Sequence, residues 1–246
     1  MDDGGHIAVN EAVSLIERGD VPVLIVCDHA SNHVPADIDL GIAPSLLRQH
    51  MAIDIGVAQV AAMLADHLKC TAMMGGASRL VIDLNREEDR DGLIPEYSDG
   101  HAIPGNVGAD REERLNRFYR PYHDAVAKRL AQMENPFILS LHSFTPNLAA
   151  VPAQKRPWEV GVLYNEDDRG ARIAIPMLED AGFVVGDQLP YSGRILNATM
   201  NRHAEANGIL YLGVEMRQDI AGTVHGQQRF ARELCAIVER ARLQLA

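Results

Sequence analysis

The sequence lacks the features that mark several protein classes. Its three cysteines, Cys27, Cys70 and Cys235, are widely spaced and form no CxxC pair, so a disulfide framework is not expected. No stretch reaches the roughly 18 consecutive apolar residues of a membrane span. Lys and Arg number 23 against 34 Asp and Glu, a net charge of −11, which argues against a nucleic-acid-binding surface. We therefore expect no nucleic-acid partner and no membrane partner.

We do not expect the N-terminal segment to act as a targeting signal. Residues 1–13, MDDGGHIAVNEAV, are acidic and polar, whereas a secretory signal peptide begins with basic residues and continues with an apolar run. Together with the unpaired cysteines, this segment predicts a cytoplasmic location. The acidic balance still permits an anionic small-molecule substrate, because a few arginines can form a positive pocket inside an acidic surface.

Apolar runs alternate with amphipathic stretches along the chain. The runs predict strands over 21–27, 70–74, 79–84, 136–141, 159–164, 183–186 and 209–214. Apolar residues at helical spacing predict helices over 44–68, 110–133 and 226–245, with Pro121 bending or breaking the second. This alternation is typical of an α/β fold with three α/β/α layers and a mixed, mainly parallel sheet. We find no linker, so residues 1–246 are expected to form one domain.

Two histidines stand where predicted core strands end. His29 follows VPVLIVCD, and His142 follows PFILSL. Reactive groups collect where the strands of an open α/β sheet emerge from the core, and histidine can bind a metal or transfer a proton. Alternatively, Asp28 and Ser31 cap a turn and the histidines are exposed or simply hydrogen-bonded. The two histidines together favour one metal site, because metal ligands come from separate segments.

A metal site of this kind requires a third ligand. Asp54 interrupts the apolar stretch MAIDIGVA, and a partly buried carboxylate there would bind either a metal or a neighbouring arginine. Asn32 lies three residues after His29, but an amide is a poor zinc ligand. We favour Asp54 as the third ligand and keep Asn32 and His33 as alternatives.

Two arginines flank the apolar centre of the segment 78–86, SRLVIDLNR. Arg86 suits recognition of a substrate carboxylate, because a guanidinium group can donate two parallel hydrogen bonds to it, and Asn85 can add a donor. Arg79 is a further substrate-binding candidate, and its alternative role is an ion pair with Asp83.

Glu215 stands where the run ILYLGVEM is expected to leave the core. A carboxylate beside metal-activated water can take its proton and pass it to a leaving nitrogen. The alternative role for Glu215 is an ion pair with an arginine such as Arg217. Arg194 follows Gly193 on a predicted loop and is either a substrate contact or a surface residue. Ser143, beside His142, is a candidate substrate contact.

The motifs resemble one known family when taken in order. VCDHASNHVP, HMAIDIG, SRLVIDLNR, SLHSF, YSGR and YLGVEMRQD are similar to the N-formylglutamate amidohydrolase family over about residues 20–240. That family is similar to zinc carboxypeptidases and to aspartoacylase and succinylglutamate desuccinylase. The resemblance implies a zinc-carboxypeptidase-like fold. It also implies roles for the matching residues: metal ligands His29 and His142, general base Glu215, carboxylate-binding residues Asn85 and Arg86, and a further substrate arginine, Arg194.

The resemblance implies a zinc-dependent amidohydrolase of a small N-acylated acidic amino acid, most simply N-formyl-L-glutamate. Zinc is the expected metal, and another divalent ion is the alternative. Two motifs depart from the pattern: HASN has Asn32 where the zinc relatives have the glutamate of HxxE, and DHAS stands where well-studied members have PHSG. The alternative functions are a zinc carboxypeptidase or amidase acting on a peptide or cell-wall fragment, and a non-catalytic protein that binds an acidic metabolite.

Overall fold

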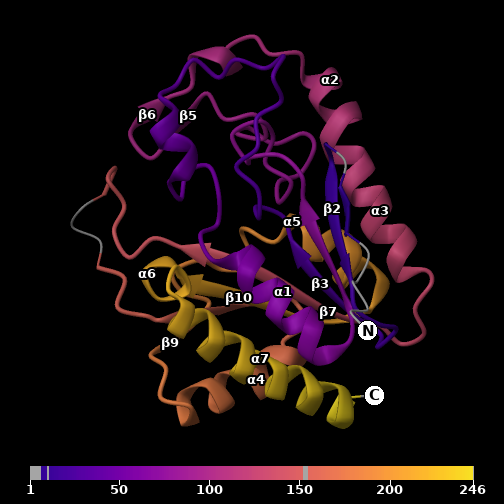
Figure 1. The fold of residues 1–246 in the computed structure, drawn as a ribbon. Coiled ribbons are helices and arrows are strands. Elements are labelled where there is room, and N and C mark those ends of the chain that lie inside the picture. The colour runs from indigo at the N-terminus through magenta and orange to yellow at the C-terminus, as the bar shows by residue number, and fades with distance from the viewer. Residues whose placement is uncertain (1–6, 10, 152–154, 246) are drawn as a thin grey trace, which may run out of the picture.

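The computed structural model describes residues 7–9, 11–151 and 155–245. Its main sheet has eight strands in the order β1-β2-β4-β3-β7-β10-β8-β9. In that order they span Ile7–Val9, Val13–Glu17, Thr71–Gly75, Val23–Cys27, Phe137–Phe144, Leu210–Arg217, Val160–Leu163 and Val185–Asp187. Figure 1 labels β2, β3, β7, β9 and β10 of this sheet. The four central strands, from β4 to β10, run parallel, and β2 and β8 pair with them antiparallel. The predicted mixed sheet is therefore confirmed.

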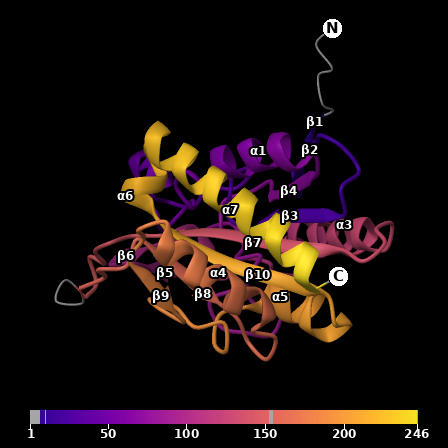
Figure 2. The same ribbon diagram turned by 90° about the horizontal axis from the view of Figure 1, so that it is seen from below.

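Helices cover both faces of this sheet. One layer contains α1 (Val57–Leu68), α4 (Arg169–Asp180) and α7 (Val224–Leu245), and the other contains α3 (Arg120–Leu130) and α5 (Ala198–His203). Figure 2 shows α7 lying between α1 and α4, and it contacts both. In the described part of the chain, no helix has the length and apolar character needed to cross a membrane.

Strand β3 shows how the sequence builds these layers. All five of its residues are buried, and successive side chains of a strand point to opposite faces. Ile25 and Cys27 pack in the core beneath α1 and α7, whereas Leu24 and Val26 pack in the core beneath α3 and α5. A continuous apolar run is therefore required here, as expected of a parallel strand that is covered on both sides.

The predicted strand over 79–84 is wrong. Leu80 is fully buried, but the segment forms turns in place of a ladder. The Ser78 hydroxyl accepts a hydrogen bond from the Leu80 N–H (3.2 Å), and the Ser78 carbonyl accepts one from the Val81 N–H (2.8 Å). These local bonds satisfy the backbone, so burial of apolar side chains does not require a strand.

The predicted helix over 44–68 is two separate pieces. Pro44–Arg48 forms a short 3₁₀ helix, and α1 begins only at Val57. Gly56 adopts a positive φ of 86° at the start of α1, and its Cα faces the Ala221 carbonyl, where a side chain would not fit. The non-helical break before α1 contains Asp54.

The predicted helix over 110–133 is continuous and is not broken at Pro121. It consists of α2 (Arg111–Arg114), a π-helical turn (Leu115–Tyr119) and α3, which contains Pro121 in its first turn. In the wider π turn the Arg120 N–H bonds the Leu115 carbonyl five residues earlier. Proline, which has no N–H, is thus accommodated directly after this turn.

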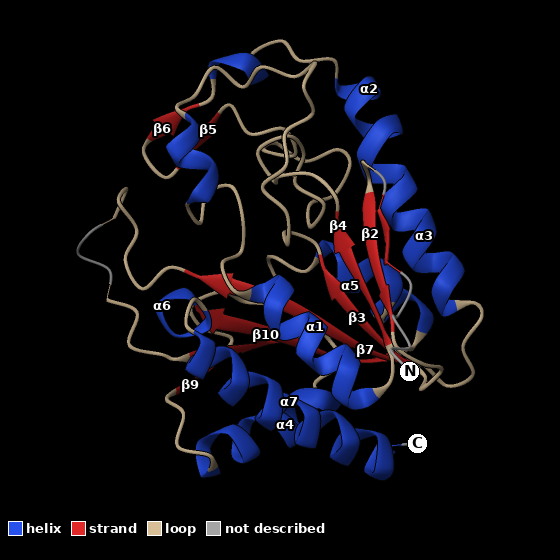
Figure 3. Cartoon of the chain, viewed as in Figure 1, coloured by secondary structure: helices blue, strands red, loops and turns tan. Residues whose placement is uncertain are grey.

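The remaining predicted elements are confirmed, with shifted ends. The helix over 226–245 corresponds to α7, and the other six strand predictions each match a strand. Strands β7 and β10 extend beyond their predicted ends, so His142 and Glu215 lie inside strands. Strands β1 and β2 and helices α4 and α5 were not predicted. Figure 3 shows that long loops and the small hairpin of β5 (Tyr97–Ser98) and β6 (His101–Ala102) form the part of the molecule beyond the parallel strands.

Candidate metal-binding active site

Three buried side chains meet at the carboxyl edge of the central strands. His29 follows β3, His142 lies in the adjacent strand β7, and the Asp54 N–H donates a hydrogen bond to the His29 carbonyl (2.9 Å). One Asp54 oxygen, Oδ2, lies 3.0 Å from His142 Nδ1 and 3.5 Å from His29 Nδ1. A ligand atom from each of the three lies within 4.8 Å of the others, which makes them a candidate metal-binding group.

The second nitrogen of each histidine faces a further buried carboxylate. His29 Nε2 lies 2.7 Å from Asp83 Oδ1, and His142 Nε2 lies 3.3 Å from Asp28 Oδ2. Histidines that bind metals almost always have such a partner on the other ring nitrogen, which orients the ring. Both rings therefore turn their Nδ1 atoms toward Asp54.

The electrostatics of this group favour a positive charge at its centre. Burial opposes protonation of His142, yet the neighbouring Asp28 and Asp54 carboxylates raise its pKa well above the usual range. Among the described residues, His29 Nδ1 is buried and has no hydrogen-bond partner. A divalent cation would satisfy that nitrogen and offset the carboxylates. The donor set of two imidazoles and one carboxylate is the kind that holds catalytic zinc with one position open.

The carboxylates of Asp28 and Asp83, which face the two histidines, are themselves held by neighbouring side chains. Tyr122 and Thr199 donate hydrogen bonds to Asp28 Oδ1 (2.8 and 3.0 Å), which leaves Oδ2 for His142. Arg79 binds Asp83 Oδ2 at 3.0 Å, so the expected Arg79–Asp83 ion pair is present. The contact between Asp83 and His29 was not predicted.

Glu215 lies directly beside the metal-binding group. It occupies the position on β10 that pairs with His142 on β7, so the register of two parallel strands places it there. Its carboxylate oxygen Oε2 is buried and has no hydrogen-bond partner in the described part of the chain. Burial raises the pKa of Glu215 to about 7. A carboxylate with a pKa near neutrality is suited to accept and return a proton.

A cavity of about 210 Å³ adjoins these groups, and we call it the active-site cavity. Its lining residues are His29, His50, Arg79, Asp83, Asn85, Arg86, His142, Ser143, Phe144, Thr145, Tyr191, Leu196 and Glu215. All four predicted substrate-binding residues, Arg79, Asn85, Arg86 and Ser143, are among them.

Three other candidates lie outside this arrangement. Arg194 is exposed and does not line the active-site cavity, so the structure gives its predicted substrate role no support. Asn32 is exposed and donates a hydrogen bond to the Leu47 carbonyl (3.0 Å). His33 is also exposed. His33 is not part of the group that Asp54 completes.

Sequence reasoning missed several lining residues that loops supply. His50 lies in the break before α1 and pairs with Asp99 of the β5–β6 hairpin (2.9 Å). Thr145 follows β7, and Tyr191 follows β9. His50 and Tyr191 are the first residues of the motifs HMAIDIG and YSGR, in which other residues were singled out. Asp99 and Thr145 lie in the long polar segments 87–109 and 145–158, and long loops in a compact domain are often functional.

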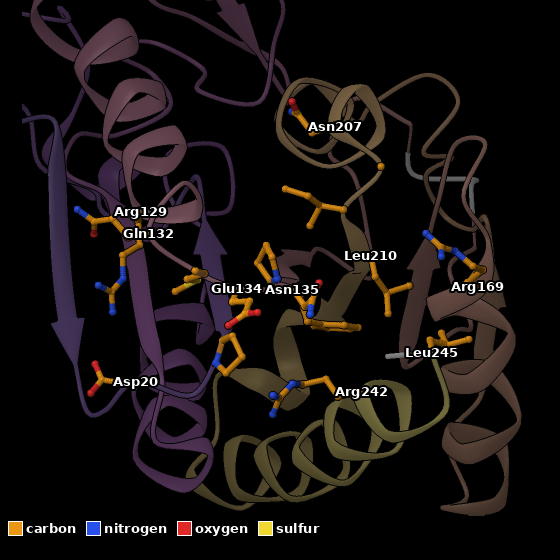
Figure 4. Close-up of a pocket in the computed structure, with 16 residues that line it drawn as sticks. Asp20, Arg129, Gln132, Glu134, Asn135, Arg169, Asn207, Leu210, Arg242 and Leu245 are labelled. Atoms are coloured by element: carbon orange, nitrogen blue, oxygen red, sulfur yellow. The ribbon is translucent and has the colours of Figure 1, made fainter.

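A larger pocket lies at the opposite edge of the sheet, before the central strands begin. It measures about 850 Å³ and is lined by residues such as Pro22, Phe137 and Leu210 at the amino ends of β3, β7 and β10. Figure 4 shows its charged side chains spread around a wide opening, with Arg129 and Arg169 on different sides. We call it the opposite-edge pocket.

Comparison with known proteins gives a consistent result. A model of the N-formylglutamate amidohydrolase family matches residues 21–221. Comparison with curated proteins gave no match. The crystal structure of a gene product from Agrobacterium tumefaciens matches this chain with a TM-score of 0.89 and 30% sequence identity, and the match covers 96% of both chains. An N-formylglutamate amidohydrolase from Ralstonia eutropha JMP134 is 19% identical, with a TM-score of 0.78, and the match covers 96% of this chain and 100% of that one.

Proposed function

The chain belongs to the N-formylglutamate amidohydrolase family, and we propose that it hydrolyses the amide bond of a small N-acylated acidic amino acid with the help of a metal. The simplest substrate is N-formyl-L-glutamate, which would yield formate and glutamate. The observation that carries this proposal is the buried His29–Asp54–His142 group with Glu215 beside it. We also propose that no nucleic acid or membrane takes part, and that the three free cysteines reflect a cytoplasmic location.

His29, Asp54 and His142 would hold the metal, with zinc as the expected ion. When bound, it would polarise the acyl oxygen and lower the pKa of a water molecule. Glu215 takes a proton from the attacking water and returns it to the departing amine nitrogen. Its burial keeps it basic enough to do so near neutral pH.

Asn85 and Arg86 are proposed to hold a substrate carboxylate, and Arg79 adds positive charge beside them. Arg79 and Arg86 both contact Asp83 Oδ2, at 3.0 and 3.4 Å, so the carboxylate that orients His29 also positions the two guanidinium groups. The volume of the active-site cavity, about 210 Å³, lies below the roughly 300–1,000 Å³ of pockets for drug-sized ligands. This size favours a single amino-acid derivative over a peptide or cell-wall fragment.

Metal analysis and substrate profiling of the purified protein test this proposal. We expect about one divalent ion per chain, release of formate from N-formyl-L-glutamate, and loss of turnover after chelation. The proposal fails if no stoichiometric ion binds and the His29→Ala variant still hydrolyses the substrate. Release of an amino acid from a peptide carboxyl terminus would favour the carboxypeptidase alternative, and ligand binding without turnover would favour the non-catalytic one.

A further inference from the structure

Arg156 is a buried arginine beside the active-site cavity that has no acidic partner. It lies in the loop between β7 and β8, and only 5% of its surface is exposed. Among the residues that the structure describes, no Asp or Glu oxygen lies within 4.0 Å of its guanidinium group. Arg114, which is similarly buried, pairs with Glu113. A buried charge without a counter-charge is costly, so a partner from outside the chain is expected at Arg156.

The contacts of Arg156 lead directly to the cavity wall. One terminal nitrogen donates hydrogen bonds to the Thr145 carbonyl (3.3 Å) and to the Tyr191 hydroxyl (3.0 Å). The guanidinium carbon lies 4.9 Å from the centre of the Tyr191 ring. Within the described residues the Arg156 Nε atom is buried without an acceptor. Thr145 and Tyr191 both line the active-site cavity, whereas Arg156 lies behind them.

The Tyr191 hydroxyl connects Arg156 to the cavity, because it can accept a hydrogen bond from Arg156 and donate one to a ligand. Its oxygen accepts a hydrogen bond from Arg156, so its own O–H is available to donate to a group in the cavity. Burial raises the pKa of Tyr191, so the hydroxyl keeps its proton at neutral pH. Arg79 and Arg86, the arginines that line the cavity, already share Asp83. Within the described residues, Arg156 therefore differs from Arg79 and Arg86 in that no Asp or Glu side chain pairs with it.

We infer that Tyr191 and Arg156 form the subsite for the side-chain carboxylate of the substrate. Tyr191 contacts the carboxylate, and Arg156 is a positioning residue that orients the Tyr191 hydroxyl and places positive charge behind it. The inference rests on the proposed function and assigns residues to the second carboxylate of its acidic substrate. The substrate is an N-acyl amino acid with two carboxylates, one held at Asn85 and Arg86 and the other at Tyr191.

The inference is tested by calorimetric binding of glutarate, a dicarboxylate, and its monoamide to the metal-loaded protein. We expect the wild type to bind glutarate roughly 10- to 100-fold more tightly, as for a hydrogen bond to a charged group. Arg156→Gln and Tyr191→Phe should each lose most of this preference, and Arg156→Lys should restore part of it. Arg232→Gln is the matched control, because it removes the same charge from a side chain that is 69% exposed.

Three results would overturn the inference: a wild type that binds both ligands equally, an Arg156→Gln variant that weakens both by the same factor, or a Tyr191→Phe variant with an unchanged preference. If Arg156→Gln does not fold, Arg156→Lys and Tyr191→Phe decide the question. The double variant should lose little more than the stronger single variant, because the two residues act as a unit. These measurements need no turnover, so a protein that prefers glutarate but hydrolyses no N-acyl substrate would refute the proposed function alone.

Discussion

The two edges of the central sheet differ in whether their charged and titratable side chains are buried or exposed. At the carboxyl edge, a cavity of about 210 Å³ adjoins His29, Asp54, His142 and Glu215, which are all buried. At the other edge, a pocket about four times larger is surrounded by exposed groups such as Glu134 (Figure 4). Burying charge costs free energy that open solvation does not, so a fold keeps such groups only where other interactions, or a ligand, compensate. Among the described residues, buried polar atoms without a hydrogen-bond partner are concentrated at the carboxyl edge, whereas the residues lining the opposite-edge pocket include one, Arg129 Nε.

The largest effect should come from removing a metal ligand at the carboxyl edge. His142→Ala takes away one of the two imidazoles of the His29–Asp54–His142 group. We expect stoichiometric metal binding to be lost. Turnover should fall by much more than the roughly 10- to 100-fold loss that is typical when a residue that only orients a metal ligand is replaced. Metal content and formate release measure this effect. A variant that keeps full metal and activity would remove His142 from the site.

Glu215→Gln should abolish proton transfer while it leaves the metal group intact. The amide has nearly the same shape but cannot accept and return a proton. We expect turnover to fall by about 10²–10⁴-fold, the usual contribution of general acid–base catalysis, with metal content unchanged. Steady-state kinetics alongside metal analysis check both points. Normal turnover in this variant would exclude Glu215 as the base.

Asp28→Asn tests whether the Asp28 carboxylate orients His142 for metal binding. Asp28 does not line the active-site cavity, so this change acts on the site through the orientation and basicity of His142. The amide oxygen of asparagine can still accept the hydrogen bonds that Tyr122 and Thr199 donate to Asp28 Oδ1. We expect metal affinity or activity to fall by roughly 10- to 100-fold. Competition with a chelator measures the affinity. An affinity within twofold of wild type would show that the Asp28–His142 contact has no role in metal binding.

A buried histidine pair between α3 and α5 should also make the fold sensitive to acid. His123 Nδ1 lies 2.9 Å from His203 Nε2, and burial lowers the pKa of His123 to about 3 and that of His203 to about 4. Unfolded histidines protonate near pH 6.5, so between pH 6.5 and about 4 the unfolded state takes up protons that the folded state does not. The pair should therefore lower the free energy of unfolding as pH falls through this range. Glu215, whose pKa is raised to about 7, offsets the effect of one of the two histidines.

Denaturant unfolding of wild type and His203→Gln at several pH values measures this dependence. Each proton contributes a slope of at most about 1.4 kcal/mol per pH unit, and the variant should show the shallower slope above pH 5. Most carboxylates begin to titrate below that pH. Identical slopes for the two proteins would contradict the assignment of this sensitivity to the histidine pair.

The smallest effect is expected from Glu134→Gln in the opposite-edge pocket. This change matches Glu215→Gln chemically, but Glu134 is exposed and lies at the far edge of the sheet. We expect turnover and metal content to stay within about twofold of wild type, because exposed charges are well solvated. A large loss of activity would show that both edges take part in function.

Sequence reasoning found the residues that β-strands position. Continuous apolar runs predict buried parallel strands, and the carboxyl ends of such strands share one edge, so His29, His142 and Glu215 were expected to meet. The register between β7 and β10 then places Glu215 opposite His142. The same reasoning misread residues 79–84, because a buried apolar run is compatible with turns once Ser78 supplies local hydrogen-bond acceptors.

The sequence by itself determined the class of fold, the strand-end histidines and glutamate, and the resemblance to the amidohydrolase family, because these depend on local patterns of side chains. Only the tertiary structure decided which of the remaining groups join them. Asp54 reaches the histidines through a break in an expected helix, Asp83 holds His29 from a turn, and Arg156 is left buried without a counter-charge behind Tyr191. These contacts join segments far apart in the chain, and such long-range packing has no signature in local sequence.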